Sequence, residues 1–430
     1  MNKESPDGRN KGMRPASSGN PKVNVVKRPT GLVKSGARPL TRSEKKDAAW
    51  ERGEKSIVRT KGGVDRPMLA IILILIALGT VMVFSASYPN AYIYENDSMF
   101  YLKKQLVFVA IGGVLMAIAS IIPYEYYKKL SPAVYVCSLG LLAAVLVYGT
   151  ARGVAQRWIY LGFISFQPSE AGKIGLVLML AWYFDKHYSE INIKKNKKNM
   201  FMRGVAVPGM IMALVCGLVA LEKHLSGTLI IGMIGVCVIF LGGANIAMMA
   251  ATYGSALVAF VAVYLMANPY ALQRITTHAD ENADILAEAW QTTQGLYAIG
   301  SGGFLGVGLG DSRLKYNYVS EAQNDFIFTI WCEEMGFVGA VILIALYSAF
   351  VWRGFTIAKK APDTYTSLVA FGITCQVGIQ AMLNMLVVTD IIPNTGISLP
   401  FFSYGGTSLV MLMAEMGLLL SISRHSYQKK

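Results

Sequence analysis

Ten runs of apolar residues, each close to membrane-spanning length, follow one another between residues 67 and 422. A helix needs about 20 residues to cross the roughly 30 Å hydrocarbon core, and lipid offers backbone amides no hydrogen-bonding partners. We therefore expect an all-α polytopic membrane protein with about ten transmembrane helices. They are predicted at 67–87, 105–122, 131–149, 168–185, 205–221, 226–241, 246–267, 326–352, 366–388 and 404–422.

The composition agrees with a membrane protein, because 53% of the residues are hydrophobic and only 15% are charged. A soluble domain has about 25% charged residues. The five cysteines and four histidines are scattered, without the spacing of a zinc site. The net charge of +14 is concentrated in residues 1–66, with 17 Lys and Arg against 7 Asp and Glu. We expect this excess to face anionic lipid and predict no nucleic-acid binding.

The domain organisation follows from the same pattern. Residues 1–66 are rich in Gly, Pro, Ser, Lys and Arg and poor in aromatic residues, so they cannot bury enough apolar surface to fold. They are also too polar for a signal peptide, so the next segment should stay in the membrane. We predict a disordered basic tail at 1–66, a ten-helix membrane domain at 67–424 and a short tail at 425–430.

Basic residues in the loops predict the orientation, since cytoplasmic loops carry an excess of Lys and Arg. With the N-terminus inside, the inner loops and C-terminal tail hold 14 basic residues in addition to the 17 of the N-terminal tail. The outer side holds eight. We therefore predict that both termini, including the tails at 1–66 and 425–430, are cytoplasmic.

A long polar loop, 268–325, separates the seventh and eighth helices and is predicted to be extracellular. Residues 285–297 have apolar side chains at helical spacing, which predicts an amphipathic helix at the interface. Asp284 lies just before this helix, where a carboxylate can cap the free amides or act as a base. The glycine-rich stretch Gly300–Gly310 lacks the spacing of a nucleotide-binding loop, so close backbone packing is the favoured interpretation.

The segment Arg157–Lys173, RWIYLGFISFQPSEAGK, leads into the fourth helix. Pro168 suits a first helical turn. Glu170 and Lys173 share one helix face, and charges at membrane depth mostly face a cavity or a partner. They form either a self-neutralising structural pair or a cavity-lining pair in which Lys173 or Arg157 meets an anionic substrate group.

Two further polar breaks interrupt the apolar runs. The stretch Glu222–Thr228, EKHLSGT, lies between the fifth and sixth helices and is equally compatible with a structural turn and with a binding role. Residues Pro393–Ser408 hold two prolines, a Gly-Gly pair and several hydroxyls before the tenth helix. They indicate either a broken helix start with exposed amides that favour anions, or a structural kink.

Together these segments resemble the SEDS family of bacterial shape, division and sporulation proteins, typified by FtsW, RodA and SpoVE, over residues 67–424. RWIYLGFISFQPSEAGK resembles the family's RW-x-x-LG-x-x-x-QPSE-x-x-K segment. EAQNDFIFTIWCEEMGFVG is similar to its E-x-x-x-DFIF-x-x-x-EE-x-G-x-x-G stretch, and GISLPFFSYGGTSL to its LPF-x-SYGG-[ST]-S signature. The likeness is closest to FtsW and implies a bacterial cell membrane protein.

The resemblance implies a peptidoglycan glycosyltransferase. Such an enzyme polymerises lipid II into β-1,4-linked strands at the outer membrane face and releases undecaprenyl diphosphate, here for the division septum. The family's catalytic aspartate shortly precedes an aromatic-Gln-x-x-Gln segment, which Trp290–Gln294 supplies, so Asp284 is the predicted catalytic residue. The predicted substrate-binding residues come from the matching segments and are Arg157, Gln167, Glu170, Lys173, Gln294, Glu321, Asp325, Ser403 and Tyr404.

In this chemistry Asp284 accepts the proton of the acceptor sugar 4-hydroxyl, which attacks the anomeric carbon bearing the diphosphate and inverts it. Departure of the diphosphate needs positive charge from Arg157, Lys173 or a divalent ion such as Mg²⁺. No organic cofactor is expected. The expected partners are lipid II, a class B penicillin-binding protein that cross-links the strands, and other divisome proteins.

The chain departs from the family pattern in three places, one of which is Gln323, where some members carry His. The loop HADENADILAEAW lacks the prolines and the glycine often found there, so Asp280 is a reserve catalytic candidate. The turn EKHLSGT stands where the family has (Q/E)PDLGT, with His224 in place of the usual acid and one extra residue. The main alternative function is a transporter that flips lipid II across the membrane, since flipping requires no base at the outer face.

Overall fold

The computed structural model describes residues 57–59, 63–152, 155–161, 164–191, 197–267, 272–273, 290–319, 322–425 and 427–429. The predicted disordered tail at 1–66 lies almost entirely outside the described residues. The helices are α2 (Arg66–Glu95), α3 (Phe100–Ile121), α4 (Tyr124–Tyr148), α5 (Pro168–Ile191), α6 (Lys197–Phe201), η1 (Met202–Ala206), α7 (Val207–Leu221), α8 (Leu225–Leu241), α9 (Ile246–Ala267), α11 (Trp290–Ser301), α12 (Ile327–Lys360), α13 (Thr364–Val388) and α14 (Thr407–Arg424).

The predicted all-α polytopic fold is confirmed, and each of the ten apolar runs corresponds to a helix. Among the described residues, eight helices are long and apolar enough to cross a membrane, when α6, η1 and α7 are counted as one continuous helix at Lys197–Leu221. The other two are α8, which is apolar but has only 17 residues, and α5, which carries several charged residues. Helix α4 begins at Tyr124, before the predicted run, because hydropathy marks only the apolar part of a helix.

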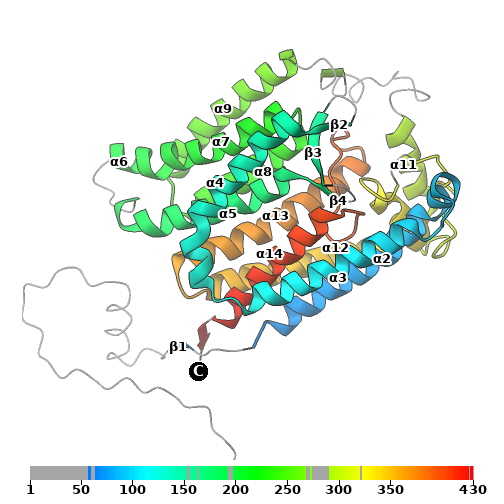
Figure 1. Cartoon of the computed structure of the whole chain (residues 1–430), viewed down its shortest axis with the longest axis horizontal. Coiled ribbons are helices and arrows are strands. Elements are labelled where there is room, and N and C mark those ends of the chain that lie inside the picture. The colour runs from blue at the N-terminus through cyan, green and yellow to red at the C-terminus, as the bar shows by residue number, and fades with distance from the viewer. Residues whose placement is uncertain are drawn as a thin grey trace, which may run out of the picture. The chain divides into compact units, whose positions relative to one another are not determined.

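The central helices are α5, α13 and α14, which other helices surround (Figure 1). In the most apolar stretch of each helix, 61% of α13 and 67% of α14 is buried, against 6% of α9. Glycine permits this close packing. A Cβ atom at Gly372 of α13 would lie 2.6 Å from Val177 of α5, and one at Gly417 of α14 would lie 2.4 Å from the Met116 carbonyl oxygen of α3.

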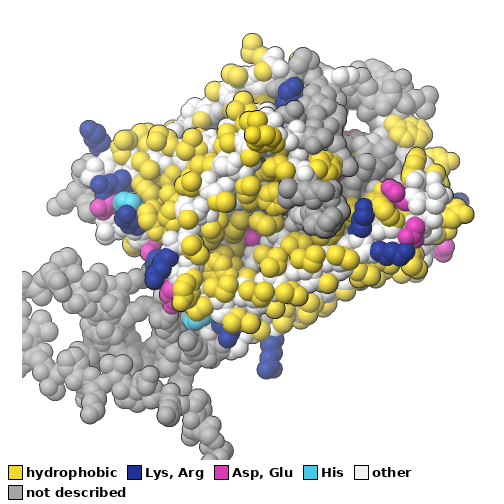
Figure 2. Space-filling view, viewed as in Figure 1, with side chains coloured by type: hydrophobic (Ala, Val, Ile, Leu, Met, Phe, Trp, Pro, Cys, Tyr) yellow, Lys and Arg dark blue, Asp and Glu magenta, His cyan; other side chains and the backbone are white. Residues whose placement is uncertain are grey.

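The surface has the character of a membrane protein. Hydrophobic side chains cover the body of the helical bundle, while Lys, Arg, Asp and Glu gather toward its two ends (Figure 2). Large apolar side chains on α3 and α9 are exposed, among them Val114 at 60% and Val258 at 71%. In a bilayer these side chains contact lipid, so their exposure is expected.

Ion pairs join the helices at the terminal end of the bundle, where α2 begins and α14 ends. Lys128 Nζ of α4 lies 2.6 Å from Asp185 Oδ2 of α5 and 3.2 Å from Asp363 Oδ2, which caps α13. Arg353 of α12 forms a bidentate pair with Asp65, the N-cap of α2. These contacts tie α4 to α5 and α13, and separately tie α12 to α2.

The opposite end, here called the pocket end, carries α11, the loop 389–406 and a small antiparallel sheet. Strands β2 (Thr150–Arg152), β3 (Ala155–Leu161) and β4 (Ile164–Phe166) pair in the order β2-β3-β4. This sheet was not predicted, because its strands are too short to produce a clear alternating pattern. A second pair, β1 (Ile57–Arg59) with β5 (Tyr427–Lys429), joins the two ends of the described chain.

Helix α12 differs from the single span predicted at 326–352. It is kinked at Gly336, whose backbone has φ 65° and ψ −166°. The glycine-rich stretch packs against this kink, since a Cβ at Gly336 would lie 2.3 Å from the Gly306 nitrogen. Val307 and Gly308 donate backbone hydrogen bonds to the Glu333 and Glu334 carbonyls, which the kink leaves free. The close backbone packing predicted for Gly300–Gly310 is confirmed.

Candidate functional site

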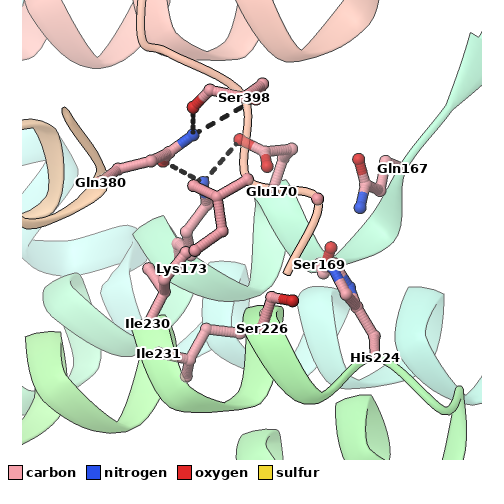
Figure 3. Close-up of a pocket in the computed structure, with 13 residues that line it drawn as sticks. Gln167, Ser169, Glu170, Lys173, His224, Ser226, Ile230, Ile231, Gln380 and Ser398 are labelled. Atoms are coloured by element: carbon pink, nitrogen blue, oxygen red, sulfur yellow. Dashed lines mark hydrogen bonds and ion pairs between the residues drawn. The ribbon is translucent and has the colours of Figure 1, made fainter. Parts of the chain in front are cut away.

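The first turn of α5 places a charged pair inside the bundle at the pocket end. Lys173 Nζ lies 2.9 Å from Glu170 Oε2 and donates a hydrogen bond to Gln380 Oε1 at 3.1 Å. The two side chains are only 6% and 13% exposed. Figure 3 shows Lys173, Glu170 and Gln380 converging with Ser398 on one side of a cavity. The pair is self-neutralised and at the same time lines the cavity.

Helix α13 presents three buried amides on one face, spaced by four residues, to three different partners. Gln376 Nε2 donates to Glu415 Oε2 of α14 at 2.7 Å. Gln380 Nε2 donates to the Ser398 carbonyl at 3.0 Å, and Asn384 Nδ2 to the Ile397 carbonyl at 2.6 Å. This amide stripe (376, 380 and 384) links α13 to α14, to α5 and to the loop 389–406.

The loop 389–406 has no helix or strand, yet side chains satisfy several of its carbonyl groups. Besides the two bonds from α13, the Thr395 carbonyl accepts from Ser226 of α8 and the Pro400 carbonyl from Tyr347 of α12. Within the loop, Ser403 Oγ accepts from the Leu399 amide at 2.8 Å. The predicted irregular start of the tenth helix is observed, with α14 beginning at Thr407.

Two neighbouring cavities lie between these elements and share four wall residues, Glu170, Lys173, Gln380 and Ser398. The larger encloses about 420 Å³, part of it open to solvent, and the smaller about 320 Å³. The other polar side chains of the larger cavity are Gln167, Ser169, His224 and Ser226, and those of the smaller are Ser403 and Ser408.

The turn between α7 and α8 closes one side of the larger cavity. Arg157 Nη2 of β3 donates to the Lys223 carbonyl of this turn at 2.9 Å. Burial raises the pKa of Glu222 to about 8, although Arg157 opposes the shift. Burial, then the charges of Arg157 and Lys173, lower the pKa of His224 to about 3. At neutral pH the side chains of Glu222 and His224 are therefore largely uncharged.

The structure brings some of the predicted substrate-binding residues together and separates others. Four of them line the cavities: Gln167, Glu170, Lys173 and Ser403. Three others lie in adjoining elements outside both walls: Gln294 of α11, Asp325 before α12, and Tyr404, which packs edge-on against Tyr101. Arg157 donates a hydrogen bond to the Lys223 carbonyl of the α7–α8 turn, which forms part of the wall of the larger cavity. Asp284, Asp280 and Glu321 lie outside the described residues.

Sequence reasoning missed several cavity residues. It did not identify Gln380 or Ser398. For Gln380 the sequence does contain a signal, because amide side chains recur at regular spacing in an otherwise apolar helix. It left the role of EKHLSGT open, and the structure places His224, Ser226 and Gly227 of this turn in the cavity wall. Among the described residues, no group of three His, Cys, Asp or Glu side chains could hold a metal ion.

Comparison with known proteins gives consistent results over most of the chain. A family profile described as "Cell cycle protein", for FtsW, RodA and SpoVE, matches residues 66–428. Stage V sporulation protein E of Bacillus subtilis is 40% identical over 370 residues, which cover 85% of this chain and 98% of the relative. A probable peptidoglycan glycosyltransferase FtsW of Thioalkalivibrio is 36% identical, with 85% and 91% covered.

Solved structures agree with the sequence relatives. A chain from a peptidoglycan synthase complex, described as coordinating polymerization and crosslinking, superposes with a TM-score of 0.69 at 28% identity. It covers 85% of this chain and 99% of the other. The rod shape determining protein RodA of Thermus thermophilus gives a TM-score of 0.62 at 28% identity, with 85% and 98% covered. The chain belongs to the FtsW/RodA/SpoVE family of cell cycle proteins.

Proposed function

We propose that this protein is a peptidoglycan glycosyltransferase that polymerises lipid II into β-1,4-linked glycan strands and releases undecaprenyl diphosphate. The observation that carries the proposal is the near full-length similarity to relatives named probable peptidoglycan glycosyltransferase FtsW. A buried, polar double cavity at one end of the bundle supports it, because an amphiphilic substrate needs polar contacts next to lipid.

In the proposed mechanism Asp284 is the general base. It takes the proton of the acceptor 4-hydroxyl while that oxygen attacks the anomeric carbon, and the bond to the diphosphate breaks with inversion. The cavity walls offer amide and hydroxyl groups that can hold the sugars. Lys173 and Arg157 are the proposed positive charges near the leaving diphosphate. A Mg²⁺ ion carried by the diphosphate would add charge there.

We place the pocket end at the outer membrane face and both termini in the cytoplasm of a bacterial cell. The support is the excess of Lys and Arg in the segments predicted to be inside. A class B penicillin-binding protein is the proposed partner, in line with the similarity to a chain from a peptidoglycan synthase complex. Cysteine substitutions at Lys223 and Lys359, tested with a membrane-impermeant thiol reagent in intact cells, would show which end is outside.

The decisive experiment supplies lipid II to the purified full chain in detergent, together with its penicillin-binding partner, and measures glycan polymer on gels. We expect polymer from the wild type and from Asp280→Ala and none from Asp284→Ala, whereas loss of polymer in Asp280→Ala alone would make Asp280 the base. Wild-type protein that makes no polymer but moves lipid II across vesicle membranes would establish the flippase alternative instead.

We assign the activity to septum synthesis during division. A role in sporulation is the second candidate, because the chain is 40% identical to stage V sporulation protein E. Depletion of the protein separates the two. Filamentous growth supports the division role, whereas normal division with failed sporulation supports the second candidate.

A further inference from the structure

The turn between α7 and α8 carries a buried imidazole that the proposed mechanism does not use. His224 is 8% exposed and lines the larger cavity. Its Nδ1 atom has no hydrogen-bond partner among the described residues. A buried polar atom without a partner is costly, and most such atoms in native proteins have one. Nδ1 itself is enclosed and packs against Gly227, so it is the remaining part of the ring, in the wall of the larger cavity, that can meet a ligand.

The backbone of the turn fixes where the imidazole lies. Lys223 adopts a left-handed conformation with φ 56°, which is rare for a residue with a side chain. The His224 carbonyl accepts hydrogen bonds from both the amide and the hydroxyl of Thr228, at 3.0 and 2.9 Å. The ring packs over Gly227, where a Cβ atom would lie only 2.6 Å from Nδ1. Figure 3 shows the ring on the same side of the cavity as Ser169 and Gln167.

The surroundings keep the imidazole neutral. The charged groups that act on it are Arg157 of β3 and Lys173 of α5, and both disfavour a protonated ring. Glu222 in the same turn is itself largely uncharged at neutral pH, because burial raises its pKa to about 8. A neutral imidazole has one N–H donor and one acceptor nitrogen. It therefore suits a hydroxyl or an amide better than an anion.

We propose that His224 is a specificity-determining residue that hydrogen-bonds a neutral hydroxyl or acetamido group of a sugar bound in the larger cavity. The inference rests on the proposed glycosyltransferase function. The neighbouring wall residues Gln167, Ser169 and Ser226 are also neutral and polar, so this side of the cavity is suited to hydrogen-bond sugar substituents. The Glu170–Lys173 side carries the charge.

The test compares His224→Leu, which removes the hydrogen bond, with His224→Asn, which keeps a neutral polar group. His187→Leu is the matched control, because His187 lies near the other end of α5 and bonds the Tyr183 carbonyl. We expect His224→Leu to raise the KM for lipid II about tenfold while kcat changes less. His224→Asn should recover part of the loss, and His187→Leu should behave as wild type.

A melting temperature measured on the same variants separates contact with substrate from a structural role. Leucine removes an unpartnered buried polar atom, so His224→Leu should melt at or above the wild-type temperature. An unchanged KM in His224→Leu, or a KM that rises only together with a lower melting temperature, overturns the inference. If the wild type makes no polymer, the proposed function fails. Direct binding of fluorescent lipid II to the wild type and His224→Leu then decides the inference separately.

Discussion

Replacing Lys315 by methionine should destabilise the protein more than any other removal of a single lysine charge in the described residues. Lys315 and Glu334 are each 1% exposed, with Nζ 3.1 Å from Oε1. Lys315 Nζ also donates to the Gly310 carbonyl at 2.6 Å, and Ser85 Oγ of α2 donates to Glu334 Oε1 at 2.6 Å. Methionine would leave the Glu334 carboxylate buried without its cation. Breaking a buried pair in this way costs about 3–5 kcal/mol.

Thermal unfolding in detergent, followed with a thiol-reactive dye that reaches the buried Cys332 and Cys375 only as the protein unfolds, measures this loss. Lys103→Met is the matched control, because the Lys103–Asp97 pair is exposed and its removal should leave the melting temperature unchanged. The double variant Lys315→Met/Glu334→Leu should recover much of the loss, since an apolar pair can replace a buried ion pair. A single variant that melts like the wild type, or a double variant no better than the single, would refute the reasoning.

Three further predictions concern the kink, the turn and the amide stripe. Gly336→Ala should lower the free energy of unfolding by about 2 kcal/mol or more, because Gly336 has φ 65° and a Cβ there would lie 2.3 Å from the Gly306 backbone nitrogen. Gly140→Ala, which has open space around the new Cβ, is the control in the same melting assay. Folding raises the pKa of Glu222 from 4.5 to about 8 and lowers the pKa of His224 from 6.5 to about 3, so the two effects on stability oppose each other below pH 6.5. Melting temperatures should therefore fall as the pH rises from about 6.5 to 8, where only the folded state holds the Glu222 proton, and Glu222→Gln should reduce this fall. Gln380→Leu removes the hydrogen bond to Lys173 and should reduce polymer formation about tenfold, and a rate equal to that of the wild type would contradict this role.

The sequence was sufficient to place the helices because membrane-spanning length and apolarity are local properties. The start of α5 at Pro168 could also be read locally, since proline suits a first helical turn. The kink of α12 could not. The backbone of Gly306, 30 positions earlier in the chain, packs directly against Gly336 at the kink, and no local sequence pattern predicts that contact.

The candidate site was predicted in part for a related reason. Glu170 and Lys173 stand out in an apolar run, and their pairing follows from i, i+3 spacing. Gln380 and Ser398 become site residues only when α13 and the loop 389–406 meet, which is a tertiary event. His224 was visible as a departure from the family pattern, but its place in the cavity wall depends on the fold of the turn.

The loop 389–406 explains why the cavities lie where they do. Irregular backbone at membrane depth is tolerated only where it is buried in protein or lines a cavity. Here helices supply the hydrogen bonds that the loop backbone lacks, with Gln380, Asn384, Tyr347 and Ser226 donating to four carbonyls between 395 and 400. A helix in that place would satisfy its own carbonyls and need none of these side chains. Polar side chains would then have no partners there, and the space they frame would fill with apolar residues. The amide stripe and the irregular loop therefore depend on each other, and the cavity is the space that they enclose.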